Sequence, residues 1–165
     1  MSELTHLDDA GNAHMVDVAD KAVTDRKASA RAIVAISDEV AQLIRHGDVP
    51  KGDALAVARI AAIAGTKRTP DLIPLCHPIA VHGVDVEVTV SESNADGRAD
   101  AIIVVTVRTA DRTGVEMEAL TGASVGALAL IDMVKGVDRA AAITEVRLLE
   151  KSGGRSGDYR YREST

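Results

Sequence analysis

The stretch TGVEMEALTGASVGALALIDMVKG (Thr113–Gly136) decides the fold. It is apolar over most of its length and free of proline, which predicts a long, largely buried α-helix. Thr113 and Glu116 have the spacing of a capping box, and Gly136 is a residue at which a helix commonly ends. Asp132 and Lys135 are charged residues within the apolar part of this helix, so they require an explanation.

The sequence on either side of this helix predicts a mixture of strands and shorter helices. Alternating residues in DRKASARAIVAI indicate a half-buried strand, and a turn, NADG, separates two further strand patterns. Residues 15–18 are expected to form a short strand or an extended arm. The predicted elements, in chain order, are a strand at 25–36, helices at 37–47 and 54–68, an irregular proline-rich segment at 69–78, strands at 83–93 and 98–109, the long helix, and a strand at 141–150.

With the first short helix treated as an insertion, this order is that of a ferredoxin-like βαββαβ sandwich. We therefore predict an α+β fold in which helices pack on one face of an antiparallel sheet. The length and uniform composition indicate one domain over residues 1–165, with residues 1–13 and 152–165 expected to be flexible.

Composition limits the classes of function. The chain of 165 residues contains no Phe or Trp, so its core must be built from small aliphatic side chains, and we expect further burial between subunits. The formal net charge of −6 argues against nucleic-acid binding. A single Cys excludes an intrachain disulfide. We see no targeting segment and no apolar run expected to span a membrane, which predicts a cytoplasmic protein.

Asp132 and Lys135 are three residues apart and are therefore neighbours on the helix surface. They form either an ordinary ion pair at the helix end or an acid–base pair that lines a cleft. Glu118 lies on the same helix face, fourteen residues before Asp132, which corresponds to roughly 21 Å. If both ends of a continuous helix serve one site, two subunits must supply them.

The segment PLCHP places Cys76 beside His77. Adjacent side chains in an extended segment point in opposite directions, which argues against a thiol–imidazole dyad. A His held between prolines is better suited to be a positioned binding group or to fill a turn. His82 is a further candidate ligand, but Cys76, His77 and His82 do not have a known zinc spacing, so no metal is predicted.

Several cations are candidates for binding an anion. Lys51 lies in a turn directly before a predicted helix, and helix N-termini attract anions. The Gly-rich basic segment KSGGRSG, residues 151–157, is suited to fold over phosphate groups through its backbone N–H groups, although it is not a Walker A motif.

Four stretches together resemble the molybdenum cofactor biosynthesis protein C family, the cyclic pyranopterin monophosphate synthases. They are LTHLDDAGNAHMVDV, KGDALAVARIAAIAGTKRTPDLIPLCHP, TGVEMEALTGASVGALALIDMVKGVD and VRLLEKSGGRSGD. The resemblance runs over about residues 4–158.

The resemblance implies a lyase of molybdenum cofactor biosynthesis that converts 3′,8-cyclo-7,8-dihydro-GTP to cyclic pyranopterin monophosphate and releases pyrophosphate. It also implies a homohexamer, a trimer of dimers with active sites at the dimer interfaces. A radical SAM enzyme that makes the substrate from GTP would be the functional partner. No metal and no organic cofactor would be required for the step itself.

The resemblance also carries residue roles to matching positions. Asp132 would be the general acid/base with Lys135 beside it, and Lys51 and His77 would assist the rearrangement or hold phosphates. The remaining substrate-binding candidates come from the LCH and EME motifs and from three separate cations: Leu75, Cys76, His77, Glu116, Met117, Glu118, Arg26, Lys67 and Lys151. We expect Lys51 and Asp132 of one site to come from different subunits.

Other functions fit the residues less fully. The first alternative is a non-catalytic nucleotide-binding ferredoxin-like regulatory module, since a fold alone does not fix a function. A metal-dependent hydrolase that uses His77 and His82, and a scaffold without a ligand, are the others. Loss of turnover in an Asp132→Asn variant would separate an enzyme from a binding module.

Overall fold

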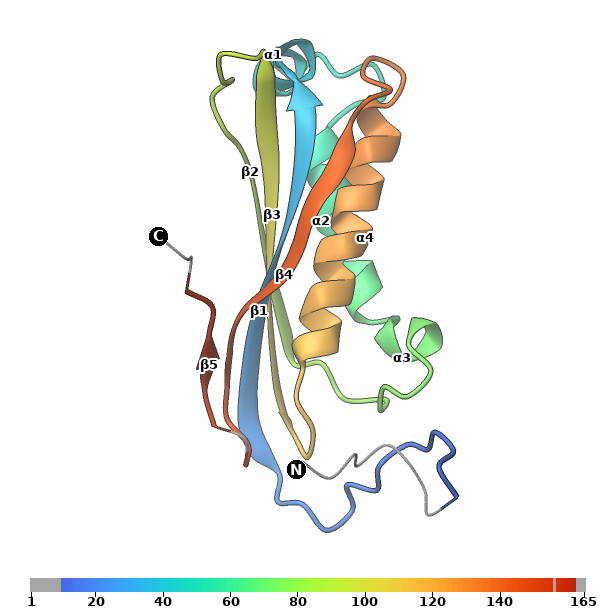
Figure 1. The fold of residues 1–165 in the computed structure, drawn as a ribbon. Helices are drawn as coiled ribbons and strands as arrows, with labels where there is room; N and C mark the ends of the chain where they lie inside the picture. The colour runs from blue at the N-terminus through green and yellow to red at the C-terminus, as the bar shows by residue number, and fades with distance from the viewer. Residues whose placement is uncertain (1–9, 156, 163–165) are drawn as a thin grey trace.

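The computed structural model describes residues 10–155 and 157–162 as a long, twisted sheet with two helices against one face (Figure 1). The elements are β1 (Thr24–Ser37), α1 (Asp38–His46), α2 (Ala54–Thr66), α3 (Thr69–Leu72), β2 (Gly83–Val90), β3 (Arg98–Asp111), α4 (Glu116–Val134), β4 (Ala142–Ser152) and β5 (Tyr159–Arg160).

The sheet confirms the predicted ferredoxin-like topology. The strand order is β2-β3-β1-β4-β5, and every neighbouring pair is antiparallel. The register places Ala30 opposite Val105 and Val34 opposite Ala101, and the side chains of all four are buried on the helix side of the sheet. The pleat sends alternate residues to opposite faces, so these alternating sequences produce one face covered by α2 and α4.

The core is built from small side chains, as the composition predicted. α2 and α4 approach closely, because a Cβ on Gly122 would lie 2.3 Å from Thr66 Oγ1 and 3.1 Å from the Ala62 carbonyl oxygen. Thr66 and Ala62 belong to α2, so only a residue without a side chain fits at this crossing. The close approach holds α4 directly against α2.

Side-chain N-caps are present at the starts of α1 and α2 and absent at the start of α4. Ser37 and Asp53 accept hydrogen bonds from the backbone N–H groups of Val40 and Ala56, as N-cap residues do. The capping box at Thr113 was wrong: α4 begins at Glu116, and its N-cap makes no side-chain hydrogen bond. The Glu116 carboxylate, which the box requires, pairs with Lys151 instead.

Two short elements were not predicted. The proline-rich segment contains the single turn α3, because Pro70 lies in the first turn of a helix, where its missing N–H group is not needed. β5 adds a short edge strand by pairing with Glu150 and Lys151 of β4. Residues 15–18 take up no regular strand and form an extended arm.

α4 is long and apolar enough, by length and composition alone, to cross a membrane. The expectation that no run would reach that threshold was therefore wrong. Half of its apolar window is buried inside the protein, against α2 and the sheet. Such burial is the ordinary reason for a core helix to be apolar on most sides.

Candidate functional site

A pocket of about 780 Å³ opens at the end of the sheet where α4 begins. Four parts of the chain meet there: the arm before β1, the segment that follows α3, the loop and first turn of α4, and the loop after β4. The residues that line it are Val16, Val18, Asp20, Lys21, Ala22, Thr24, Arg26, Leu75, Cys76, His77, Arg112, Thr113, Gly114, Glu116, Met117, Lys151, Gly154 and Arg155.

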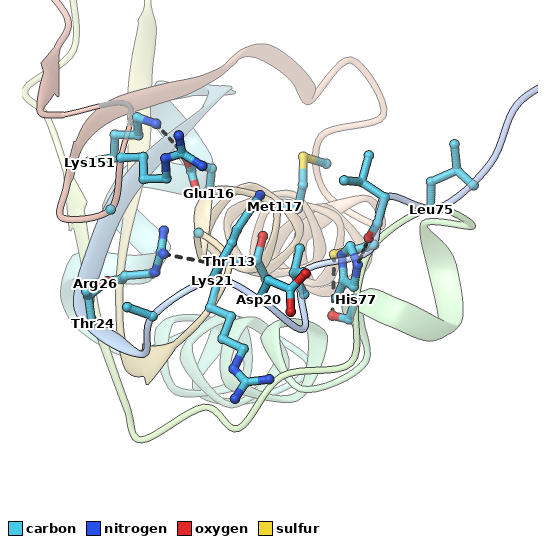
Figure 2. Close-up of a pocket in the computed structure, with 18 residues that line it drawn as sticks. Asp20, Lys21, Thr24, Arg26, Leu75, His77, Thr113, Glu116, Met117 and Lys151 are labelled. Atoms are coloured by element: carbon cyan, nitrogen blue, oxygen red, sulfur yellow. Dashed lines mark hydrogen bonds and ion pairs between the residues drawn. The ribbon is translucent and has the colours of Figure 1, made fainter. Parts of the chain in front are cut away.

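The pocket is cationic although the chain as a whole is anionic. Five of the lining side chains are Lys or Arg, and two are Asp or Glu. One acid is already neutralised, because Lys151 Nζ lies 3.1 Å from Glu116 Oε1. Figure 2 shows Arg26 and Lys151 on one side of the pocket, Leu75 and His77 on the other, and Lys21 between them. The pocket is therefore suited to an anionic ligand.

His77 is held by the arm. Its Nε2 lies 2.7 Å from the Val16 carbonyl oxygen, and since a carbonyl oxygen can only accept, Nε2 carries the proton. In the neutral ring, Nδ1 is then the basic nitrogen. The arm thus fixes both the orientation and the tautomer of His77, as a positioned binding or proton-transferring group requires.

Cys76 and Glu118 form a contact behind the pocket wall. Cys76 Sγ lies 3.5 Å from Glu118 Oε1, and burial together with this carboxylate raises the pKa of the thiol to about 12. Cys76 is therefore protonated at neutral pH and is not a nucleophile, in keeping with the argument against a Cys–His dyad. Glu118 is 1% exposed, and burial raises the pKa of its carboxyl.

Asp132, Lys51 and Lys135 form a second cluster, at the opposite end of α4. Asp132 Oδ2 lies 3.0 Å from Lys51 Nζ, and Asp132 Oδ1 lies 2.6 Å from Lys135 Nζ. Lys51 Nζ also donates to the Asp132 carbonyl oxygen at 2.6 Å. Hydrogen bonds and charge from Lys135 and then Lys51 lower the pKa of Asp132. The three side chains are 45–59% exposed in the single chain, so this carboxylate is ionised and solvated.

The two clusters are far apart within one chain. α4 is continuous from Glu116 to Val134, and the sixteen positions between Glu116 and Asp132 correspond to about 24 Å. Figure 1 places α3 and the start of α4 at one end of the molecule, and α1 and the end of α4 at the other. The condition for a site shared between subunits, a continuous helix with a cluster at each end, is therefore met.

The structure brings together most of the predicted substrate-binding residues but not all of them. Leu75, Cys76, His77, Glu116, Met117, Arg26 and Lys151 all line the pocket. Glu118 is buried behind Cys76 and is not part of the lining, and Lys67, the exposed C-cap of α2, lies outside it as well. Lys51 and Asp132, expected from different subunits, are partners within one chain.

Two cations of the pocket, Lys21 and Arg112, were not selected from the sequence. Lys21 is one basic residue among many, and Arg112 directly precedes the apolar stretch of α4, so spacing along the chain carries no signal for either. A third, Arg155, lies in the Gly-rich basic segment 151–157 that was expected to fold over phosphate groups. Among the described residues, no group of three or more His, Cys, Asp or Glu side chains is placed to hold a metal ion.

Comparison with known proteins gives a consistent picture. The model of the MoaC family matches residues 15–154. A cyclic pyranopterin monophosphate synthase of Streptomyces griseus subsp. griseus is 59% identical, over 96% of this chain and 86% of its own length. A Nocardioides protein of the same name is 53% identical over 94% of both chains. Cyclic pyranopterin monophosphate synthase 2 of Mycobacterium tuberculosis is 55% identical over 95% of this chain. This chain belongs to the MoaC family.

Proposed function

We propose that the protein is a cyclic pyranopterin monophosphate synthase of molybdenum cofactor biosynthesis, and that each active site is built from two subunits. The proposal draws its activity from the named relatives. It is a lyase: 3′,8-cyclo-7,8-dihydro-GTP enters, and cyclic pyranopterin monophosphate and pyrophosphate leave. A radical SAM enzyme supplies the substrate, and the reaction takes place in the cytoplasm.

One observation supports the shared site above all others. The acid–base cluster around Asp132 and the cationic pocket around His77 lie at opposite ends of a continuous helix, about 24 Å apart. No single small substrate reaches both. An antiparallel arrangement of two chains, with the end of α4 from one beside the start of α4 from the other, brings the two halves together twice in each dimer.

The surfaces of α2 and α4 support association between copies of the chain. Ile60 and Leu128 are 68% and 58% exposed, and Val57 is exposed as well. Large apolar side chains in such positions are commonly covered by a partner, and a core of small residues gains from additional burial. We propose a homohexamer, a trimer of dimers, in which this burial stabilises the assembly.

The reaction requires both proton transfer, which we assign to the Asp132 cluster, and phosphate binding, which we assign to the cationic pocket. The purine-derived ring must open and reclose, which requires proton transfers. Lys135 and Lys51 lower the pKa of Asp132 and keep it ionised, which is the form that a general base requires. A second subunit that covers Asp132 would exclude water and raise its affinity for that proton. Meanwhile a P–O bond forms and pyrophosphate leaves, and cations fixed in the pocket stabilise the developing charge.

The test uses pairs of inactive variants. A His77→Ala chain and an Asp132→Asn chain, mixed and reassembled, form heterodimers in which one site receives both changes and the other receives neither. Random pairing then restores about a quarter of the wild-type turnover. Turnover is followed as pyrophosphate and as oxidised pterin product, in an assay coupled to the radical enzyme and GTP.

The matched control combines two variants of the same cluster, Asp132→Asn and Lys51→Ala. Both residues lie in one chain, 3.0 Å apart, so every hybrid site lacks one of them and no recovery is expected. No recovery in the first pair after verified subunit exchange would disprove the shared site. Recovery in the control pair would instead show that Lys51 and Asp132 of one site come from different subunits, which contradicts the proposed division of residues between the two halves. Wild-type assemblies that bind nucleotide without turnover would point to the regulatory module instead.

A further inference from the structure

We propose that Lys21, Arg112 and Arg155 bind the polyphosphate of the substrate, and that Arg26 acts as a positioning residue that holds two of them in place. This inference rests on the proposed function for the identity of the ligand. It replaces the expectation, drawn from the family resemblance, that Arg26 itself is a phosphate partner.

The guanidinium of Arg26 forms hydrogen bonds with two backbone carbonyl groups. Nε donates to the carbonyl oxygen of Asp111 at 2.9 Å, and Nη2 donates to that of Arg112 at 3.0 Å. These two carbonyl groups belong to the end of β3 and to the first residue of the loop before α4. Arg26 therefore fixes the path of the chain at Arg112, by the fork-shaped geometry that only an arginine provides.

The other side of the same guanidinium packs against the loop after β4. A Cβ on Gly154 would lie 2.3 Å from Arg26 Nη1, and Gly154 has a φ of +79°. Only glycine satisfies both the conformation and the space. Arg26 is thus wedged between two loops, one of which carries Arg112 and the other Arg155.

The remaining cations of the pocket fall into two groups. Lys151 is paired with Glu116. Lys21, Arg112 and Arg155 line the same pocket, and their side chains make no hydrogen bond or ion pair with the residues that the structure describes. Each comes from a different segment: the arm before β1, the loop before α4, and the loop after β4.

Three cations that have no side-chain partner among the described residues, and that converge from three segments, suit a ligand with several adjacent anionic groups. A triphosphate is such a ligand, and arginine forks bind phosphate oxygens in pairs. Asp20 is the one acid of the lining that has no cation paired with it in the described structure, and it lies beside Lys21 in sequence. The opposite wall, with Leu75, Cys76 and His77, is left for the ring portion of the substrate.

The first experiment measures binding of inorganic tripolyphosphate to the assembled protein by titration calorimetry. Lys21→Gln, Arg112→Gln and Arg155→Gln are each expected to weaken binding about tenfold. Arg112→Lys and Arg155→Lys keep the charge and recover most of that loss. Arg26→Lys recovers nothing relative to Arg26→Gln, because a single ammonium nitrogen cannot take the place of the planar fork whose Nε and Nη2 each reach one of the two carbonyl groups.

Gly154→Ala provides an independent test of the position of Arg26 between the two loops. It is expected to weaken tripolyphosphate binding as Arg26→Gln does, since the added Cβ displaces the guanidinium. Gly97→Ala is the matched control: Gly97 has a φ of +71° in the β2–β3 turn, and its Cβ would meet nothing within 4 Å. It introduces the same backbone strain and leaves binding unchanged.

Turnover separates this inference from the proposed function. In the coupled assay, the three glutamine variants should raise KM for the substrate far more than they lower kcat. An active wild type that does not bind tripolyphosphate, or binding that survives in Arg112→Gln and Arg155→Gln, overturns the inference alone. Rescue by Arg26→Lys would make Arg26 a ligand and also overturns it. If tripolyphosphate binds as expected but the wild type shows no turnover, the cation site is supported and the proposed function is wrong.

Discussion

The two ends of α4 place a carboxyl group in opposite environments, with opposite effects on its pKa. At the start of the helix, Glu118 is buried against Cys76, and burial raises its pKa. At the end, Asp132 is solvated between Lys51 and Lys135, which lower its pKa. The carboxyl of Glu118 is enclosed by residues of its own chain. The carboxylate of Asp132 has its two lysine partners, but none of the described residues of its own chain covers it. This contrast supports the proposal that a second subunit completes the site at Asp132.

The largest expected effect is on catalysis at the exposed end. Asp132→Asn should lower turnover by a factor of about 100 to 10,000, the range of a lost general acid/base, while the thermal unfolding midpoint stays close to the wild-type value. The melting point should change little because Asn keeps the size of Asp, and within one chain the Asp132 side chain is 57% exposed and makes ion pairs only with Lys51 and Lys135.

The matched control for this variant is Asp71→Asn. Asp71 is also an exposed carboxylate with a basic partner three residues away, Arg68, at 3.4 Å. Its turnover should match the wild type. Near-normal product formation by Asp132→Asn would show that the exposed cluster is only a surface ion pair. Asp132 would then not be the general acid/base.

A smaller effect tests the helix that separates the two ends. Gly122→Ala should lower the free energy of unfolding by about 1 to 3 kcal/mol, because its Cβ would overlap the hydroxyl group of Thr66, itself fixed by a hydrogen bond to Ala62. Chemical denaturation measures the change. Gly136→Ala, where a Cβ meets nothing within 4 Å, should stay within about 0.5 kcal/mol of the wild type. Equal stability of both variants would contradict the close approach of α2 and α4.

The smallest effect concerns the buried carboxyl. In the unfolded chain Glu118 titrates near pH 4.3, but burial raises its pKa in the folded protein. Between these two values the unfolded state releases a proton that the folded state keeps, so the wild type loses stability as pH rises. Relative to the wild type, Glu118→Gln should therefore gain unfolding free energy across that window, about 1.4 kcal/mol for each pKa unit, and none below it.

Glu150→Gln is the control with the opposite sign. Its hydrogen bond and ion pair with Lys27 lower the pKa of Glu150, so its contribution to stability is present above the unfolded pKa and lost as pH falls through the folded one. Stability curves against pH, measured by denaturant titration, should therefore diverge from the wild type in opposite directions. Parallel curves for Glu118→Gln and the wild type would show that burial does not perturb Glu118.

Much of the fold followed from local patterns. Alternation in β1 and the NADG turn between β2 and β3 predicted the sheet, and the helices predicted at 37–47 and 54–68 correspond to α1 and α2. The capping box at Thr113 failed because Glu116 had a competing partner, Lys151, thirty-five residues later in the chain. A local rule cannot foresee a distant charge that binds the same carboxylate more favourably.

The sequence by itself determined the topology, the family, and the separation of Asp132 from the EME motif, because periodicity and a fixed rise per residue are properties of the chain alone. Only the tertiary structure decided which cations share the pocket, that Glu118 is buried behind it, and that Arg26 is tied to two backbone carbonyl groups. These facts depend on segments far apart in sequence meeting at one end of the sheet. Side chains acquire their partners and their solvent exposure only when those segments pack.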